Sequence, residues 1–107
     1  MQAEVFGLSL SHIETIRSIF LQYPEIQQVK IFGSRALGTY KANSDIDFVL
    51  YTATQLNDRM LKRLTLDFME SALPFQVDLL IYSEITHAGL LEHIERCAQI
   101  FYCSVEK

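Results

Sequence analysis

Apolar side chains recur every three or four residues in the first quarter of the chain, the spacing of a helix that buries one face. They are Ile13, Ile16, Phe20 and Tyr23. Ser11 and Glu14, three residues apart, have the form of a capping box at the start of this helix. Pro24 ends the pattern, because proline cannot continue a helix.

Three later segments carry the β-branched and aromatic residues typical of strands: residues 28–32, 45–51 and 75–82. Between the second and third, apolar residues recur every four positions from about residue 54 to 72, which predicts a long amphipathic helix stopped by Pro74. A last helix is expected over residues 85–96. The apolar tail, residues 100–103, is expected to add an edge strand.

This alternation of helices and strands predicts a single α/β layer domain over residues 1–107. A helical connection allows the second and third strands to be parallel, whereas the short connection from residue 33 to 44 favours an antiparallel first pair. The resulting mixed sheet would bring Gly33, Asp45 and Asp78 to one edge.

Composition narrows the class of protein. Half of the 107 residues are hydrophobic, enough apolar surface for one core. The net charge of −4 disfavours general nucleic-acid binding. We also expect a cytoplasmic protein without a membrane span, because no apolar run is long enough and the N-terminus does not resemble a signal peptide. Cys97 and Cys103 are expected to be free thiols.

Asp45 and Asp47 form an Asp-x-Asp pair at the start of the second strand. Side chains alternate along a strand, so both carboxylates share one side and repel each other unless a cation or a proton intervenes. Asp78 lies within the otherwise apolar third strand. Three such carboxylates suit two magnesium ions, although each feature alone is also typical of a solvated strand face.

Gly33 and Ser34 follow the first strand and have the chemistry of a phosphate-binding turn. Glycine lets a phosphate approach the backbone, and the serine offers a hydroxyl donor. Arg35 and Lys41 add positive charge in the same loop. By itself a Gly-Ser pair is equally consistent with an ordinary strand-ending turn.

The combination of these motifs is more specific than its parts. Gly33-Ser34, ten intervening residues and Asp45-x-Asp47 resemble the signature of the nucleotidyltransferase superfamily that includes DNA polymerase β. Ala36 and Gly38 fit its Gly-Ser-x-Ala-x-Gly extension, and Asp78 matches its third carboxylate. Because this core accounts for the whole chain, the sequence is similar to the minimal nucleotidyltransferase (MNT) subgroup, commonly found as the antitoxin of pairs with HEPN-domain toxins.

The resemblance implies a polymerase-β-like core with a mixed three- to four-stranded sheet flanked by about four helices. It also implies a magnesium-dependent enzyme, with two ions held by Asp45, Asp47 and Asp78. ATP would bind at Gly33, Ser34 and Arg35, and AMP would pass to a hydroxyl of a HEPN-type partner in a homo- or hetero-oligomer. Leu37 departs from the pattern, since many members have arginine there. Cys97-Ala98 also departs, where a glycine is frequent.

Two other functions remain open from the sequence. One is a non-catalytic antitoxin that neutralises its partner by covering it. The other is a nucleotidyltransferase for a small molecule such as an aminoglycoside, although such enzymes typically add a helical domain that this chain lacks.

Two further groups of residues are ambiguous. His93 and Cys97 are four apart on a predicted helix, but two ligands do not complete a zinc site, so we interpret them as packing residues. Arg59, Lys62 and Arg63 form a basic patch at helical spacing. The patch could dock an acidic partner or be a solvated helix face.

Overall fold

The computed structural model describes residues 5–104. Its helices and strands follow one another in the order predicted from the sequence, with a short 3-10 helix, η1, added. They are α1 (Leu10–Leu21), β1 (Ile26–Phe32), α2 (Ser34–Leu37), β2 (Ile46–Thr52), α3 (Asp58–Met69), β3 (Val77–Ile81), η1 (Tyr82–Glu84), α4 (Ala88–Cys97) and β4 (Gln99–Cys103).

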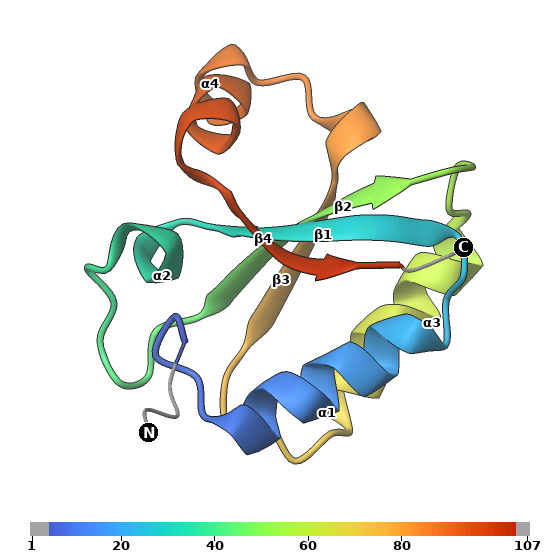
Figure 1. Ribbon diagram of the computed structural model, residues 1–107. Coiled ribbons are helices and arrows are strands. Elements are labelled where there is room, and N and C mark those ends of the chain that lie inside the picture. The colour runs from blue at the N-terminus through green and yellow to red at the C-terminus, as the bar shows by residue number, and fades with distance from the viewer. Residues whose placement is uncertain (1–4, 105–107) are drawn as a thin grey trace.

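The four strands form one mixed sheet in the order β3-β2-β1-β4 (Figure 1). β1 is antiparallel to β2 and to β4, whereas β2 and β3 run parallel across the α3 connection. The predicted orientations and the predicted edge strand at the C-terminal end are therefore confirmed. The sheet has two open edges, one at β3 and one at β4.

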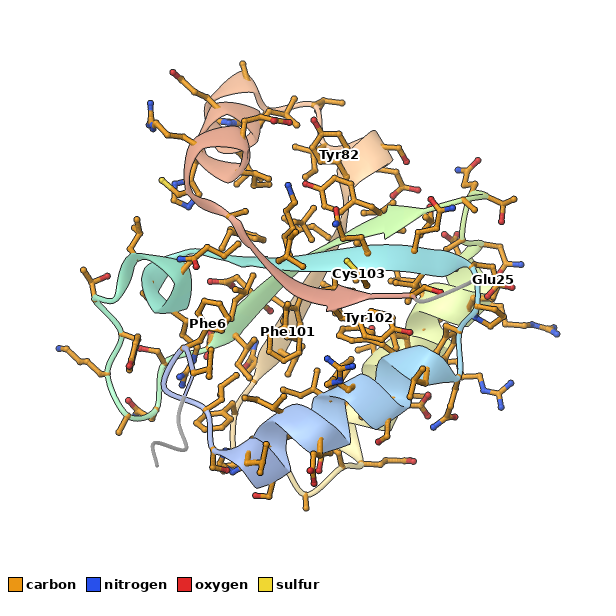
Figure 2. The ribbon with its side chains drawn as sticks, in the orientation of Figure 1. Phe6, Glu25, Tyr82, Phe101, Tyr102 and Cys103 are labelled. Carbon is orange, nitrogen blue, oxygen red and sulfur yellow. The ribbon has the colours of Figure 1, made fainter. Side chains whose placement is uncertain are left out.

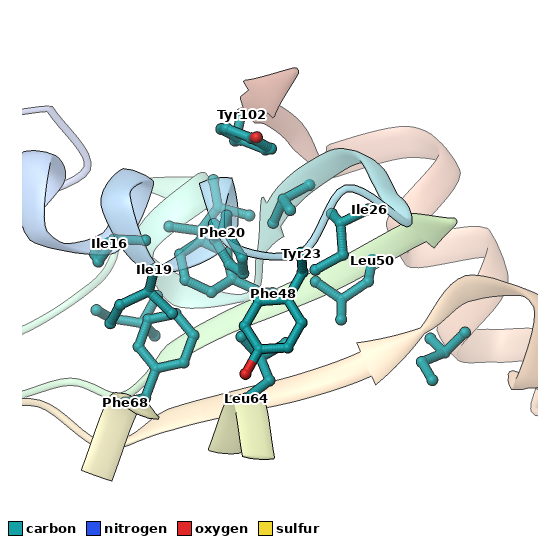
Figure 3. Packing of buried hydrophobic residues seen from close by; sticks show 14 of the residues in the cluster. Ile16, Ile19, Phe20, Tyr23, Ile26, Phe48, Leu50, Leu64, Phe68 and Tyr102 are labelled. Atoms are coloured by element: carbon teal, nitrogen blue, oxygen red, sulfur yellow. The ribbon is translucent and has the colours of Figure 1, made fainter. Parts of the chain in front are cut away.

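Helices α1 and α3 cover one face of the sheet, and α4 lies against the other (Figure 1). Under α1 and α3, Phe20 is fully buried and contacts the rings of Phe48, Phe68 and Tyr102, with ring centroids 5.4 to 5.6 Å apart (Figure 3). Such aromatic pairs stabilise a core beyond their buried area. This larger core fixes the strands on which the site is built.

A smaller core lies between the sheet and α4 around Phe32, Val49 and Ile94. Ile94 belongs to α4, so this cluster attaches the helix to the end of β1 and the centre of β2. The attachment brings the side chains of α4 close to the point where β1 ends and β2 begins. No helix in residues 5–104 has the length and apolar character required to cross a bilayer.

Helix boundaries differ from those expected. α1 is capped by Ser9 and His12, not by Ser11 and Glu14: the Ser9 hydroxyl accepts from the His12 N–H, and the Ser9 N–H donates to the His12 ring. The fourth helix begins at Ala88 instead of residue 85, because η1 first turns the chain away from β3. Local hydrogen-bonding groups decide such ends, and several candidates lie within a few residues of each other.

Candidate active site

The three predicted carboxylates come from neighbouring parallel strands. Asp47 of β2 and Asp78 of β3 are register partners, and Asp45 lies immediately before β2. Phe32, the last residue of β1, is paired with Asp47 on its other side. The register therefore places Gly33 and Ser34 next to the carboxylates, as the sequence predicted.

Asp47 is the most buried of the three; Asp45 and Asp78 are exposed. The pKa of Asp47 is raised to about 6, chiefly by burial and then by the charge of Asp78, a hydrogen bond with Asp78 and the charge of Asp45. A carboxyl group with such a pKa is stabilised by a proton or by a cation.

The donor set fits magnesium, which prefers carboxylate oxygens together with water and substrate phosphates. Asp45, Asp47 and Asp78 offer only such oxygens, and Asp47 experiences the mutual repulsion that a cation relieves. Within residues 5–104, no three acidic, histidine or cysteine side chains already enclose a position for a metal ion. The two-ion arrangement therefore remains a prediction.

Gly33 links β1 to α2 in a conformation that only glycine adopts readily, with φ +76° and ψ −153°. A side chain at this position would collide with Oδ2 of Asp47. The Gly33 backbone therefore lies directly against the central carboxylate, and a phosphate bound at the turn would lie close to that carboxylate.

Ser34 is half-buried and is the first residue of α2. Its carbonyl oxygen accepts from the N–H of Thr39, which closes the turn after α2. Its hydroxyl makes no hydrogen bond to any residue between 5 and 104, so it is available to a ligand. Contact of Ser34 with nucleotide phosphates remains a prediction.

The Arg35 side chain does not face the phosphate-binding turn, contrary to the prediction from the sequence. Only 2% of the residue is exposed, and the guanidinium donates to the carbonyl oxygens of Ser44 and of Phe6, which lies beside α2 (Figure 2). It also lies over the rings of Tyr40 and Phe75, 5.3 and 4.6 Å from their centroids. Since its donors are engaged inside the protein, Arg35 acts as a clamp between segments rather than as a phosphate ligand.

His93 of α4 belongs to the site, although the sequence analysis interpreted it as a packing residue. Its Nε2 accepts a hydrogen bond of 3.3 Å from the N–H of Gly33, and its ring packs edge-on against Phe32. An accepting Nε2 is unprotonated, so the ring proton of the neutral form is on Nδ1. No local sequence pattern signals this contact, because 60 residues separate the two partners.

The two cysteines are free, as predicted, and Cys97 has no part in the hydrogen bond of His93. Lys41 is exposed in the loop before β2. The backbone N–H of Lys41 donates to the Ser44 hydroxyl, which orders the loop that leads to Asp45.

Comparisons with known proteins agree with this geometry. The profile of the polymerase beta nucleotidyltransferase family matches residues 14–107. Among proteins of curated function, no match was found.

Several solved structures have the same fold. A chain of a toxin–antitoxin complex with AMP-PNP is 25% identical, with a TM-score of 0.70 over 86% of this chain and 73% of that one. A chain of the MntA–HepT toxin–antitoxin is 22% identical, with a TM-score of 0.63 over 86% and 70%. A chain of the Shewanella oneidensis complex of tri-AMPylated HEPN toxin with MNT antitoxin is 18% identical, with a TM-score of 0.59 over 86% and 73%.

Proposed function

The chain belongs to the polymerase β nucleotidyltransferase family, and we propose that it transfers AMP from ATP to a hydroxyl of a HEPN-type partner protein, as the antitoxin of a toxin–antitoxin pair. The observation that carries the proposal is the convergence of Gly33, Asp47 and Asp78 at one rim of the sheet. This convergence provides a place for phosphates beside a place for cations.

Each residue has a proposed role in binding. Asp45 and Asp47 would hold the magnesium ion that accompanies the nucleotide, and Asp78 would help to hold a second ion. When bound, such ions neutralise phosphate charge and lower the pKa of an attacking hydroxyl. Gly33 supplies a close approach for the phosphates, and Ser34 donates its hydroxyl to a phosphate oxygen.

The other residues of the site orient these groups. His93 accepts from the N–H of Gly33, and so ties the turn to α4. The Arg35 clamp holds the loop through Ser44, directly before Asp45. The carboxylates and the turn are therefore presented from a supported frame, which lowers the cost of ordering them around a substrate.

The nature of the acceptor is proposed from the related complexes. One of them pairs an MNT antitoxin with a tri-AMPylated HEPN toxin, and another contains AMP-PNP. These complexes support ATP as the donor and a HEPN protein as the acceptor. We further propose that the modified group is a tyrosine, serine or threonine hydroxyl. The resemblance to MNT antitoxins implies that the partner is a ribonuclease, and AMP added beside its active site would block RNA by charge and by bulk.

The test is co-expression with the HEPN partner, followed by intact mass measurement of that partner. We expect a mass increase of one or more AMP units with the wild-type chain and none with the Asp45→Asn/Asp47→Asn double variant. A partner that is neutralised without any mass change, equally well by the double variant, would show that this chain acts by covering its partner.

A further inference from the structure

A groove follows α3 along the open edge of the sheet and ends at Asp78. β3 is the outermost strand, and α3 lies beside it (Figure 1). The largest part of the groove is a pocket of about 530 Å³ whose lining residues are Thr65, Phe68, Met69, Phe75, Gln76, Val77 and Asp78. A hollow of about 390 Å³ continues from Thr65 along Leu61, Lys62 and Leu66. We call these two hollows together the acceptor groove.

The lining of the acceptor groove is mainly apolar, with one carboxylate at its end. Met69 is 73% exposed and Leu66 is 51% exposed, both large values for apolar side chains on a small domain. Phe68 contributes to both the groove and the main core. An apolar trough that ends at Asp78 of the edge strand suits a segment that buries aliphatic or aromatic side chains next to the proposed site.

Positive charge borders the apolar trough. Arg59, Lys62 and Arg63 lie on the outward face of α3, three and four residues apart, and Lys62 lines the groove itself. None of them forms an ion pair with any residue from 5 to 104, where the one salt bridge joins Glu92 and Arg96. In a protein with a net charge of −4, Lys62 thus lies in the groove itself, and Arg59 and Arg63 line the adjoining hollow that Lys62 and Leu66 share. The natural complement of these cations is an acidic segment.

The strand edge offers backbone groups to the same segment. The carbonyl of Gln76 accepts from the N–H of Ile46 in β2, so the alternate residues Val77 and Leu79 direct their backbone groups away from β2. An extended chain can pair with such an edge, and its alternate side chains then enter adjacent pockets.

From these observations we propose that the acceptor groove binds an extended acidic segment of the acceptor protein, whose hydroxyl then lies at Asp78. This proposal rests on the proposed function, because it identifies the surface that the acceptor occupies. Lys62 contacts an acidic side chain of the segment, and the apolar side chains of the segment fill the pocket that Phe68 and Met69 help to line.

The test uses variants that change the groove and leave the nucleotide site alone. Met69→Glu places a negative charge at the groove, and Lys62→Glu reverses one of its cations. Leu21→Glu is the control for Met69→Glu, since Leu21 is a similarly exposed apolar residue on α1. Arg96→Glu is the control for Lys62→Glu, since it changes charge equally on the exposed side of α4.

Binding of the purified HEPN partner and of magnesium-ATP is measured separately by calorimetry. We expect both groove variants to bind the partner at least about tenfold more weakly than wild type, with unchanged magnesium-ATP affinity and melting temperature. The controls should bind both ligands as wild type does. Partner affinity that is unchanged in both groove variants, or equally weakened in the controls, would overturn the proposal.

Two further outcomes are informative. A wild-type chain that binds the partner through the groove but transfers no AMP would refute the proposed function and leave the groove assignment in place. Sedimentation of the chain alone detects the competing occupant: if wild type is a dimer that Met69→Glu dissociates, the groove binds a second copy and the acceptor assignment is wrong.

Discussion

At the scale of single residues, position 33 is restricted to glycine both by its backbone conformation and by its contact with Asp47. Its φ of +76° with ψ of −153° lies in a region closed to other residues, and its α-carbon faces Oδ2 of Asp47. Gly38 also has positive φ, +83°, but is surrounded by open space. Substitutions at the two glycines therefore distinguish the cost of backbone strain, which both share, from the effect of a contact with Asp47, which only Gly33 makes.

We expect Gly33→Ala to lower stability by more than the about 1–2 kcal/mol typical of a forced left-handed residue, and to abolish transfer because Asp47 is displaced. Gly38→Ala should cost only the about 1–2 kcal/mol of the left-handed backbone and retain transfer, since its added methyl group contacts nothing. Chemical denaturation and a transfer assay measure both. Equal loss of activity in the two variants would contradict a specific contact between Gly33 and Asp47.

The raised pKa of Asp47 predicts a dependence of stability on pH. The folded chain holds this proton up to about pH 6, whereas the unfolded chain releases it near the ordinary value of 3.8. Stability of the metal-free protein therefore falls as the pH rises from about 4 to about 6, and the loss is complete above that range.

Replacing Asp47 with asparagine removes this loss. Without metal, Asp47→Asn should melt at a higher temperature than wild type at pH 7.5, and the difference should shrink as the pH is lowered through 6 towards 4. Scanning calorimetry in a chelating buffer at several pH values measures it. A difference that does not change with pH would mean that the charge of Asp47 is not the cause.

His93 is expected to act as a positioning residue. His93→Leu removes the acceptor of the Gly33 N–H, a hydrogen bond whose loss costs about 0.5–1.5 kcal/mol, so the KM for ATP should rise roughly two- to tenfold. The kcat should change less, since His93 does not contact the reacting atoms. His93→Gln, which can also accept from Gly33, should restore most of the affinity; if it behaves as leucine does, His93 contributes only packing.

At the scale of elements, α2 is too short to be stable by its own hydrogen bonds and depends on Arg35. This side chain leaves the four-residue helix and joins the N-terminal turn, through Phe6, to the loop before β2, through Ser44. The rings of Tyr40 and Phe75 surround the guanidinium. One buried cation thus holds three segments that have little regular structure.

We expect Arg35→Leu to destabilise the chain by about 2–3 kcal/mol, because the carbonyl oxygens of Phe6 and Ser44 lose a charged donor. Arg35→Lys should recover only part of this, since an ammonium group lacks the planar fork that reaches both. Lys41→Leu, in the same loop but exposed, is the control and should change stability little. Denaturant titration compares the three; a larger loss for Lys41→Leu than for Arg35→Leu would contradict the clamp.

The helices and strands were the part of the fold that the periodicity of apolar residues could predict. We could predict α1, α3, β1 and β2 because the prediction depends only on the local spacing and density of apolar residues. The sequence displays both directly. Helix starts were predicted less well. Ser9 replaces Ser11 as the cap of α1, because whether a cap forms depends on the path of the preceding chain.

At the scale of the whole molecule, membership of the nucleotidyltransferase family and the mixed sheet with four α-helices are confirmed. Substrate binding should then be measurable as global stabilisation, because the sheet that carries Asp47 and Asp78 also runs through the main core. A ligand that binds only the folded chain stabilises it in proportion to the logarithm of its concentration.

Magnesium-ATP at about one hundred times its Kd should raise the free energy of unfolding by about 2.7 kcal/mol, and a chelator should reverse the gain. The Asp45→Asn/Asp47→Asn double variant should not respond. Thermal denaturation with a non-hydrolysable ATP analogue measures this without turnover. Stabilisation that is equal in the double variant would place the nucleotide away from these carboxylates.

The sequence by itself determined the order of the elements, the orientations of the strands and the arrival of Gly33, Asp45 and Asp78 at one rim. Spacing along the chain and the length of each connection are local properties, and they were sufficient for these features. The tertiary structure alone decided that Arg35 is buried and that His93 reaches Gly33. Both depend on how distant segments pack on the sheet, and packing is a property of the whole chain that no local pattern contains.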